Sequence, residues 1–176
     1  MNVECAITEC SQPIGYNIGP VLEAREDMET LYGGGPHEIV DKATNLAGIL
    51  LEMVGNENGK QMALDLINNG CALEKMRQII DAQGGNSSVK PEDLVPGEYY
   101  HDVNADRDGR ILWFNNRDLV KIARAAGTPN DMGAGIMLYA KTGDKVSVDK
   151  PMFRVFAEKQ EKLYNAVKQH RNLRPV

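Results

Sequence analysis

The stretch Thr8-Glu-Cys-Ser-Gln-Pro-Ile-Gly-Tyr-Asn-Ile-Gly-Pro-Val-Leu-Glu-Ala-Arg-Glu-Asp27 decides how this chain begins to fold. The short apolar run before it, residues 3–8, predicts a strand, and the glycines and prolines within it predict a loop. Pro20 and the carboxylates after it predict a helix start. Such an arrangement commonly binds anions, and a tight turn between packed elements explains it equally well. No further strand is predicted before residue 99, so we interpret the chain as a fragment of a larger protein.

Composition restricts the class of protein. The chain has 176 residues, of which 42% are hydrophobic and 26% charged, which is typical of a globular protein with one large domain or two small ones. A net charge of −5 argues against sequence-independent nucleic-acid binding, which needs clustered cations. The basic residues after Lys159 alternate with acidic and apolar residues, a pattern typical of a solvated helix face.

The cysteines and the apolar runs indicate a cellular location. Cys5, Cys10 and Cys71 are an odd number and form no Cys-x-x-Cys motif, so we expect reduced thiols and no thiolate metal site. No apolar run reaches 18 residues, and no signal sequence opens the chain. We therefore expect a soluble cytoplasmic protein without membrane contacts.

Periodicity divides the chain into a helical half and a mixed half. Helices are predicted over 36–54, 59–69 and 72–83, and the first has a wide apolar stripe at Ile39, Val40, Ala43, Leu46, Ala47, Leu50, Leu51 and Val54. Residues 84–96 are the predicted linker. Strands follow at 99–103 and 110–114 around an Asp108-Gly109 turn, and then at 134–140, 145–148 and 152–157. Two more helices are predicted over 117–126 and 159–170. This pattern indicates an α+β protein.

Three motifs suggest chemistry but have simpler interpretations. Residues 104–111 have the oxygen-ligand spacing of a calcium loop, yet Asn115 stands where a bidentate Glu is needed, so a polar hairpin turn is preferred. The glycines at 33–35 lack the following Lys and Ser/Thr of a phosphate loop. His37, His101 and His170 have no partner at a fixed spacing. We therefore assign no catalytic residue.

Resemblance to a known family adds what spacing does not. The opening stretch resembles a segment of thymidine and pyrimidine-nucleoside phosphorylases. The archaeal AMP phosphorylase branch is closest, through Gly34-Gly-Pro-His, Leu46-Ala-Gly-Ile-Leu-Leu-Glu, Ala82-Gln-Gly-Gly, Asp108-Gly-Arg-Ile-Leu-Trp-Phe-Asn-Asn, Asp131-Met-Gly-Ala-Gly-Ile and Lys141-Thr-Gly-Asp-Lys-Val. The resemblance spans essentially the whole chain.

The resemblance implies a division into residues 1–85, a remnant of the phosphorylase α/β domain with one strand plus helices, and residues 96–176, a carboxy-terminal α+β module. It implies a pentosyltransferase, in which phosphate displaces the base from AMP or from a thymidine or pyrimidine nucleoside. The residues that bind phosphate and base lie upstream in that family, so we expect the isolated chain to be inactive. Whether this chain should itself be called an enzyme is left open. A homo-oligomer is expected.

One site of the family reaches into this chain. Its members bind a monovalent cation, potassium, with two backbone carbonyls and a carboxylate, and the matching positions are Ile14, Asn17 and Glu26. Oxygen ligands suit such a hard cation. The remaining ligands lie upstream, so we expect weak or no binding by this chain. No other cofactor is implied.

The terminal module resembles an α/β-hammerhead or barrel-sandwich-hybrid fold through residues 143–157. It lacks the exposed hairpin lysine of a carrier domain. The alternative to a phosphorylase part is a non-catalytic interaction or assembly module, because the open edge of a strand at residues 3–8 would invite another chain.

Overall fold

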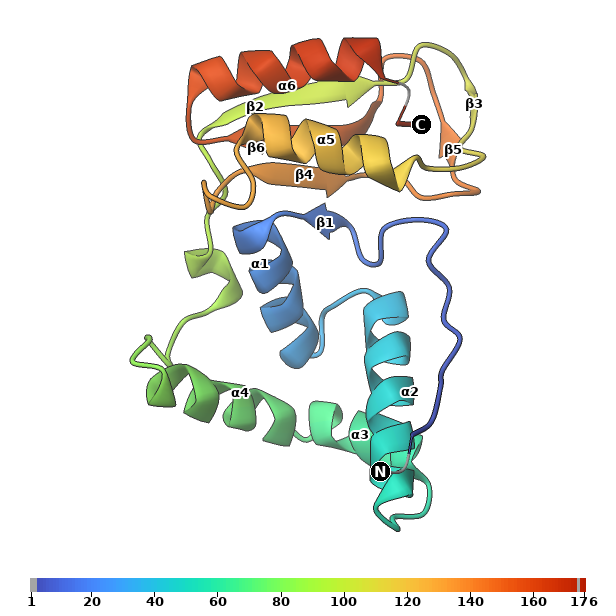
Figure 1. Cartoon of the computed structure of the whole chain (residues 1–176), viewed down its shortest axis with the longest axis vertical. Coiled ribbons are helices and arrows are strands. Elements are labelled where there is room, and N and C mark those ends of the chain that lie inside the picture. Colours follow the sequence, from blue (N-terminus) through green and yellow to red (C-terminus); the bar gives the residue numbers. More distant parts are fainter. Residues whose placement is uncertain (1–2, 174) are drawn as a thin grey trace. The chain divides into compact units, whose positions relative to one another are not determined.

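The structure is a computed structural model that describes residues 3–173 and 175–176. It is a mixed α+β protein, as the sequence predicts (Figure 1). The described residues form two compact units, the first comprising 3–9 and 26–93, the second 10–25 and the residues from 94 onward. Helix α1 (Pro20–Leu31) begins in the second unit and ends in the first. The division into residues 1–85 and 96–176 that the resemblance implies stays a prediction.

The first unit consists mainly of helices. Besides the end of α1 it contains α2 (His37–Met53), α3 (Gly59–Asn68), α4 (Cys71–Ala82) and a short 3-10 helix, η1 (Pro91–Asp93). The predicted helix bounds are confirmed to within a few residues. Local signals account for this, since Pro36 precedes α2, and Gly70 and Gly84 adopt the left-handed φ values, +81° and +78°, of helix-terminating glycines.

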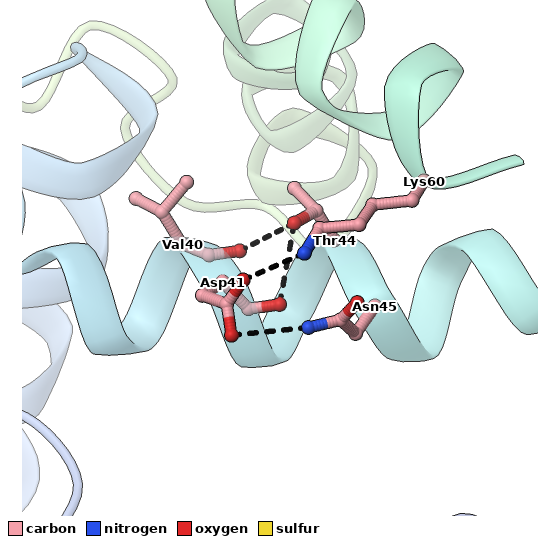
Figure 2. A network of polar contacts seen from close by, with 5 residues as sticks. All are labelled: Val40, Asp41, Thr44, Asn45 and Lys60. Carbon is pink, nitrogen blue, oxygen red and sulfur yellow. Dashed lines mark hydrogen bonds and ion pairs between the residues drawn. The ribbon is translucent and has the colours of Figure 1, made fainter. Parts of the chain in front are cut away.

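Helices α2 and α3 cross where each carries a glycine. A Cβ atom on Gly48 would lie 2.5 Å from the backbone nitrogen of Lys60, and one on Gly59 would lie 2.1 Å from the carbonyl oxygen of Gly48. The two backbones are therefore in direct contact. Figure 2 shows the side chains beside this crossing, where the Lys60 ammonium group lies 2.7 Å from Asp41 Oδ1 and links α3 to α2.

The apolar stripe of α2 is only partly covered. Thr44 and Gly48 are the buried residues of this helix, whereas Leu46, Leu50 and Val54 are 41%, 65% and 76% exposed. Helix α4 has no buried residue, and its Ile79 is 46% exposed. The periodicity is confirmed, but the described residues do not bury these faces.

The second unit is built on a four-stranded antiparallel sheet with strand order β1-β4-β6-β2. These strands are β1 (Asn17–Ile18), β2 (Tyr99–Asn104), β4 (Gly135–Leu138) and β6 (Pro151–Ala157). A separate ribbon pairs β3 (Gly109–Arg110) with β5 (Lys145–Val146).

Helices α5 (Asn116–Ala126) and α6 (Gln160–Asn172) pack together over one face of this sheet (Figure 1). Every second side chain of the central strands points to this face. Among these side chains, Ile136, Phe153 and Val155 are fully buried. Leu119 and Ile122 of α5 meet them from the helix side. Asn115 caps α5 by accepting a hydrogen bond from the Asp118 backbone nitrogen, and Gly127 follows its last residue.

Two strand predictions are wrong. Residues 3–8 form no strand, so the open edge that motivated an assembly module is absent there. Residues 111–114 are also not a strand, and β2 and β3 do not form a hairpin, because β2 pairs with β6 and β3 pairs with β5. Both errors concern short segments whose strand character depends on partners distant in sequence.

Candidate functional site

The predicted cation ligands lie around the start of helix α1. Ile14 is in the loop before β1 and is 41% exposed, and Asn17 is the first residue of β1, opposite Met137 of β4. Glu26 is in α1 and is only 5% exposed. Ile14 and Asn17 belong to the second unit and Glu26 to the first.

The loop that contains Ile14 is fastened to the segment after β4. The Lys141 ammonium group donates a hydrogen bond to the Pro13 carbonyl and lies 5.0 Å from the centre of the Tyr16 ring. The Thr142 backbone nitrogen donates to Gln12 Oε1 at 2.9 Å. Lys141 is only 7% exposed, so this contact is shielded from water. The backbone around Ile14 is thereby held in one position.

The start of α1 is closed to anions by its own side chain. Glu23 Oε1 accepts a hydrogen bond from the Gly19 backbone nitrogen at 2.8 Å, which places a carboxylate at the positive end of the helix. Gly19 has φ of +130°, and a Cβ atom there would lie 2.4 Å from the Ala134 carbonyl oxygen. The glycine is thus needed for close packing against β4, and the tight-turn interpretation of this stretch is favoured over the anion site.

A row of four residues, three of them polar, crosses the face of the sheet that α5 and α6 leave uncovered. It runs from Asn17 through Met137 and Arg154 to Asp102, which lie directly opposite one another on successive strands. The Arg154 guanidinium donates to both Asp102 oxygens, at 2.7 and 2.8 Å, and stacks 4.0 Å from the centre of the Tyr100 ring. This hydrogen bonding lowers the pKa of Asp102 and raises that of Arg154.

The polar hairpin turn preferred for residues 104–111 is wrong, because β2 and β3 pair with different strands. Asp106 is paired with Arg107, and Asp108 accepts a hydrogen bond from the Val148 backbone nitrogen, so the calcium-like loop uses its carboxylates internally. No cluster of three or more His, Cys, Asp or Glu residues suited to a metal occurs among the described residues. His170 is half-buried, and desolvation lowers its pKa. Within the described parts of the chain, no helix has the length and apolar character needed to cross a bilayer.

Sequence reasoning missed the two anchoring contacts of this region. Lys141 belongs to one of the family motifs. None of the residues near it in the sequence indicates that it contacts Pro13, 128 residues away. Asp102 and Arg154 are 52 residues apart and meet only because β2 pairs with β6. A prediction of strand pairing would have been the signal needed.

Comparisons with known proteins agree with the family resemblance. Residues 113–175 match the family described as pyrimidine nucleoside phosphorylase C-terminal domain. The whole chain is 45% identical to an AMP phosphorylase of Methanosarcina mazei, of which it covers 36%. It is 46% identical to one of Pyrococcus furiosus and 47% identical to one of Thermococcus sibiricus, covering 35% of each with 99% of its own length. The chain spans about a third of the length of these relatives and matches their carboxy-terminal part.

Proposed function

Since this chain belongs to the pyrimidine-nucleoside and AMP phosphorylase family and corresponds to the carboxy-terminal part of its archaeal members, we propose that it is the carboxy-terminal part of a phosphorylase acting on AMP. In this reaction phosphate attacks C1′ of the ribose, the bond to the base breaks, and the products are adenine and ribose 1,5-bisphosphate. The transition state has oxocarbenium character, so catalysis depends mostly on positioning and electrostatics. A thymidine or pyrimidine nucleoside is the alternative substrate.

The observation that carries this proposal is the identity of about 45% over the whole chain, including the loop before α1. The described residues contribute a rigid support for that loop, through Lys141 and Thr142. We infer that the carboxy-terminal unit positions this segment in the complete phosphorylase. The terminal unit, with its antiparallel sheet, two helices and ribbon, is in our proposal a hammerhead- or hybrid-type module.

We propose that the isolated chain is inactive. The α1 start holds the Glu23 carboxylate instead of an anion, and the glycines at 33–35 lack a phosphate-binding lysine. The purified chain should be incubated with phosphate and AMP, CMP, UMP or thymidine while free base is measured by chromatography. No base release above background is expected. Release at rates typical of enzymes would show that the chain carries a complete site.

We further propose that Ile14 and Asn17 supply backbone carbonyls, and Glu26 its carboxylate, to potassium in the complete phosphorylase. The chemistry of these groups supports this, because oxygen ligands suit such a hard cation. Thermal unfolding of the chain in potassium chloride and in choline chloride should coincide within error, since further ligands are expected upstream. A potassium-specific rise in Tm that Glu26→Gln abolishes would instead assign a complete site to this chain.

The assembly alternative is supported by α2 instead of residues 3–8. Leu46 and Leu50 of α2 and Val54 just after it recur every four residues and are exposed, so they form one apolar strip. We propose that this strip contacts the amino-terminal part of a phosphorylase polypeptide, and that the assembled protein is a cytoplasmic homo-oligomer. Analytical ultracentrifugation with and without a separately expressed upstream part tests this. A chain that sediments as a monomer in both samples would argue against assembly.

A further inference from the structure

The start of α1, helix α5 and the loop after α5 form the walls of a hollow with a volume of about 440 Å³. All of its lining residues belong to the second unit. Small-molecule sites typically measure about 300–1,000 Å³ and are mostly apolar, with a few polar groups that orient the ligand. This hollow has the same character. Its apolar lining consists of Ile18, Pro20, Val120, Ala123 and Pro129.

The walls of the hollow are held in place by contacts outside it. The Val21 backbone nitrogen donates to the Met132 carbonyl at 3.1 Å, which ties the start of α1 to the loop after α5. The same loop is fastened to α6 by an ion pair of 2.6 Å between Lys162 and Asp131. Binding to such a preformed site costs less free energy, because few groups of the protein must be ordered.

Two opposite charges line the hollow, those of Glu23 and Arg124. The Arg124 guanidinium, in the last turn of α5, forms no hydrogen bond or ion pair with any residue that the structure describes. Glu23 Oε1 accepts a hydrogen bond from the Gly19 backbone nitrogen, whereas Oε2 has no partner within the described parts of the chain. A guanidinium and a carboxylate oxygen are therefore available to a ligand in the same hollow.

We propose that this hollow binds a free α-amino acid with an apolar side chain. The ligand carboxylate pairs with Arg124, whose fork of donors matches a carboxylate, and the ligand ammonium group pairs with Glu23. The side chain of the ligand contacts the apolar lining. A ligand with one charge only is repelled by the like charge of the hollow, since Glu23 repels a carboxylate or a phosphate and Arg124 repels an amine. The inference concerns residues of this chain alone and does not depend on the function proposed above.

Methyl NMR spectra of the purified full chain test the proposal, because the side chains of Ile18 and Val120 line the hollow and carry methyl groups. Leucine, isocaproate, isoamylamine and glycine are titrated separately at constant ionic strength. Saturable shifts of both methyl signals by leucine are expected. Isocaproate lacks the ammonium group, isoamylamine the carboxylate and glycine the side chain, so each should bind at least about tenfold more weakly. Shifts by leucine that do not saturate would overturn the proposal, and so would equal affinity for leucine and any of the other three.

Two variants and a control locate the site. Arg124→Gln should weaken leucine binding about tenfold while leaving isoamylamine unchanged, and Glu23→Gln should weaken leucine binding about tenfold without weakening isocaproate. Arg117→Gln is the matched control, because Arg117 is exposed on the same helix but does not line the hollow. Circular dichroism verifies folding, and Arg124→Gln, at an exposed residue, serves if Glu23→Gln unfolds. An equal loss in all three variants would indicate non-specific charge effects and would refute the site, as would an unchanged affinity for leucine in Arg124→Gln.

Discussion

The close contact between Gly48 and α3 predicts that replacing Gly48 with alanine will lower the free energy of unfolding of the chain. In an exposed helix interior, Gly→Ala stabilises by about 1 kcal/mol, because glycine loses more backbone entropy on folding. At Gly48, however, the added Cβ atom would lie 2.5 Å from the Lys60 nitrogen and 2.7 Å from its Cα atom. Carbon atoms in optimal contact are about 3.5–4.0 Å apart, so the helices must separate by about 1 Å.

The magnitude follows from the two opposing effects. Overpacking typically costs about 1–3 kcal/mol, and the Lys60 backbone atoms that the new Cβ atom meets cannot rotate away as a flexible side chain would. Subtracting the intrinsic gain of about 1 kcal/mol leaves a net destabilisation of up to about 2 kcal/mol for Gly48→Ala. The same displacement would also strain the ion pair between Lys60 and Asp41, which contributes little because both side chains are about half exposed (Figure 2).

Urea unfolding followed by far-UV circular dichroism measures this change in the free energy of unfolding. Ala43→Gly is the matched control, because Ala43 is exposed on the same helix. It should destabilise by about 1 kcal/mol through entropy alone. Glycine is therefore expected to be the better residue at position 48 and the worse one at position 43. A Gly48→Ala variant more stable than the natural chain would refute the close approach of the two backbones.

Three further predictions concern the loop anchor, a histidine and the exposed strip. Lys141→Met should lower stability by about 1.5–3 kcal/mol, because it removes a charged donor from the Pro13 carbonyl; faster hydrogen exchange of the Leu138 amide, which bonds to Tyr16, would locate the effect, and unchanged exchange would contradict it. Burial lowers the pKa of His170, so the stability from its neutral form is present above the ordinary pKa of about 6.5 and is lost as the pH falls through the lower folded value. His170→Phe should flatten this acid-side loss in thermal unfolding scans, and an unaltered profile would assign the dependence to other groups. Leu50→Glu should leave the stability of the chain unchanged within about 0.5 kcal/mol, because Leu50 is 65% exposed. It should nevertheless reduce co-sedimentation of the chain with a separately expressed upstream part. Undiminished co-sedimentation would exclude the α2 strip from the contact.

The helices of this protein could be read from local residues. Pro20, Pro36 and Asn115 stand at helix starts, and Gly70 and Gly84 adopt the conformations that end helices. Each of these signals acts within one turn of the chain, so no tertiary contact is needed to interpret it. The strands were predicted less well, since a run such as residues 3–8 has strand composition but no strand to pair with.

For the candidate site, the sequence indicated which residues belong to it but not the contacts that hold them. Ile14, Asn17 and Glu26 were found by resemblance, and their proposed role as cation ligands stays a prediction. The contacts that hold the loop, from Lys141 and Thr142, cross about 130 residues of sequence. No rule of periodicity or spacing predicts contacts over that distance in sequence, because such contacts depend on which strands lie side by side.

Local chemistry thus accounts for the helix bounds, the α+β class and the apolar stripe of α2, whereas the family was indicated by resemblance. Tertiary structure alone decided that β2 pairs with β6, that Arg110 lies opposite Lys145 and that Lys141 reaches the Pro13 carbonyl. It also decided that Leu50 and Val54 stay exposed. The physical reason is that helix signals arise from neighbouring residues, whereas pairing and burial depend on whatever surface the folded chain brings near.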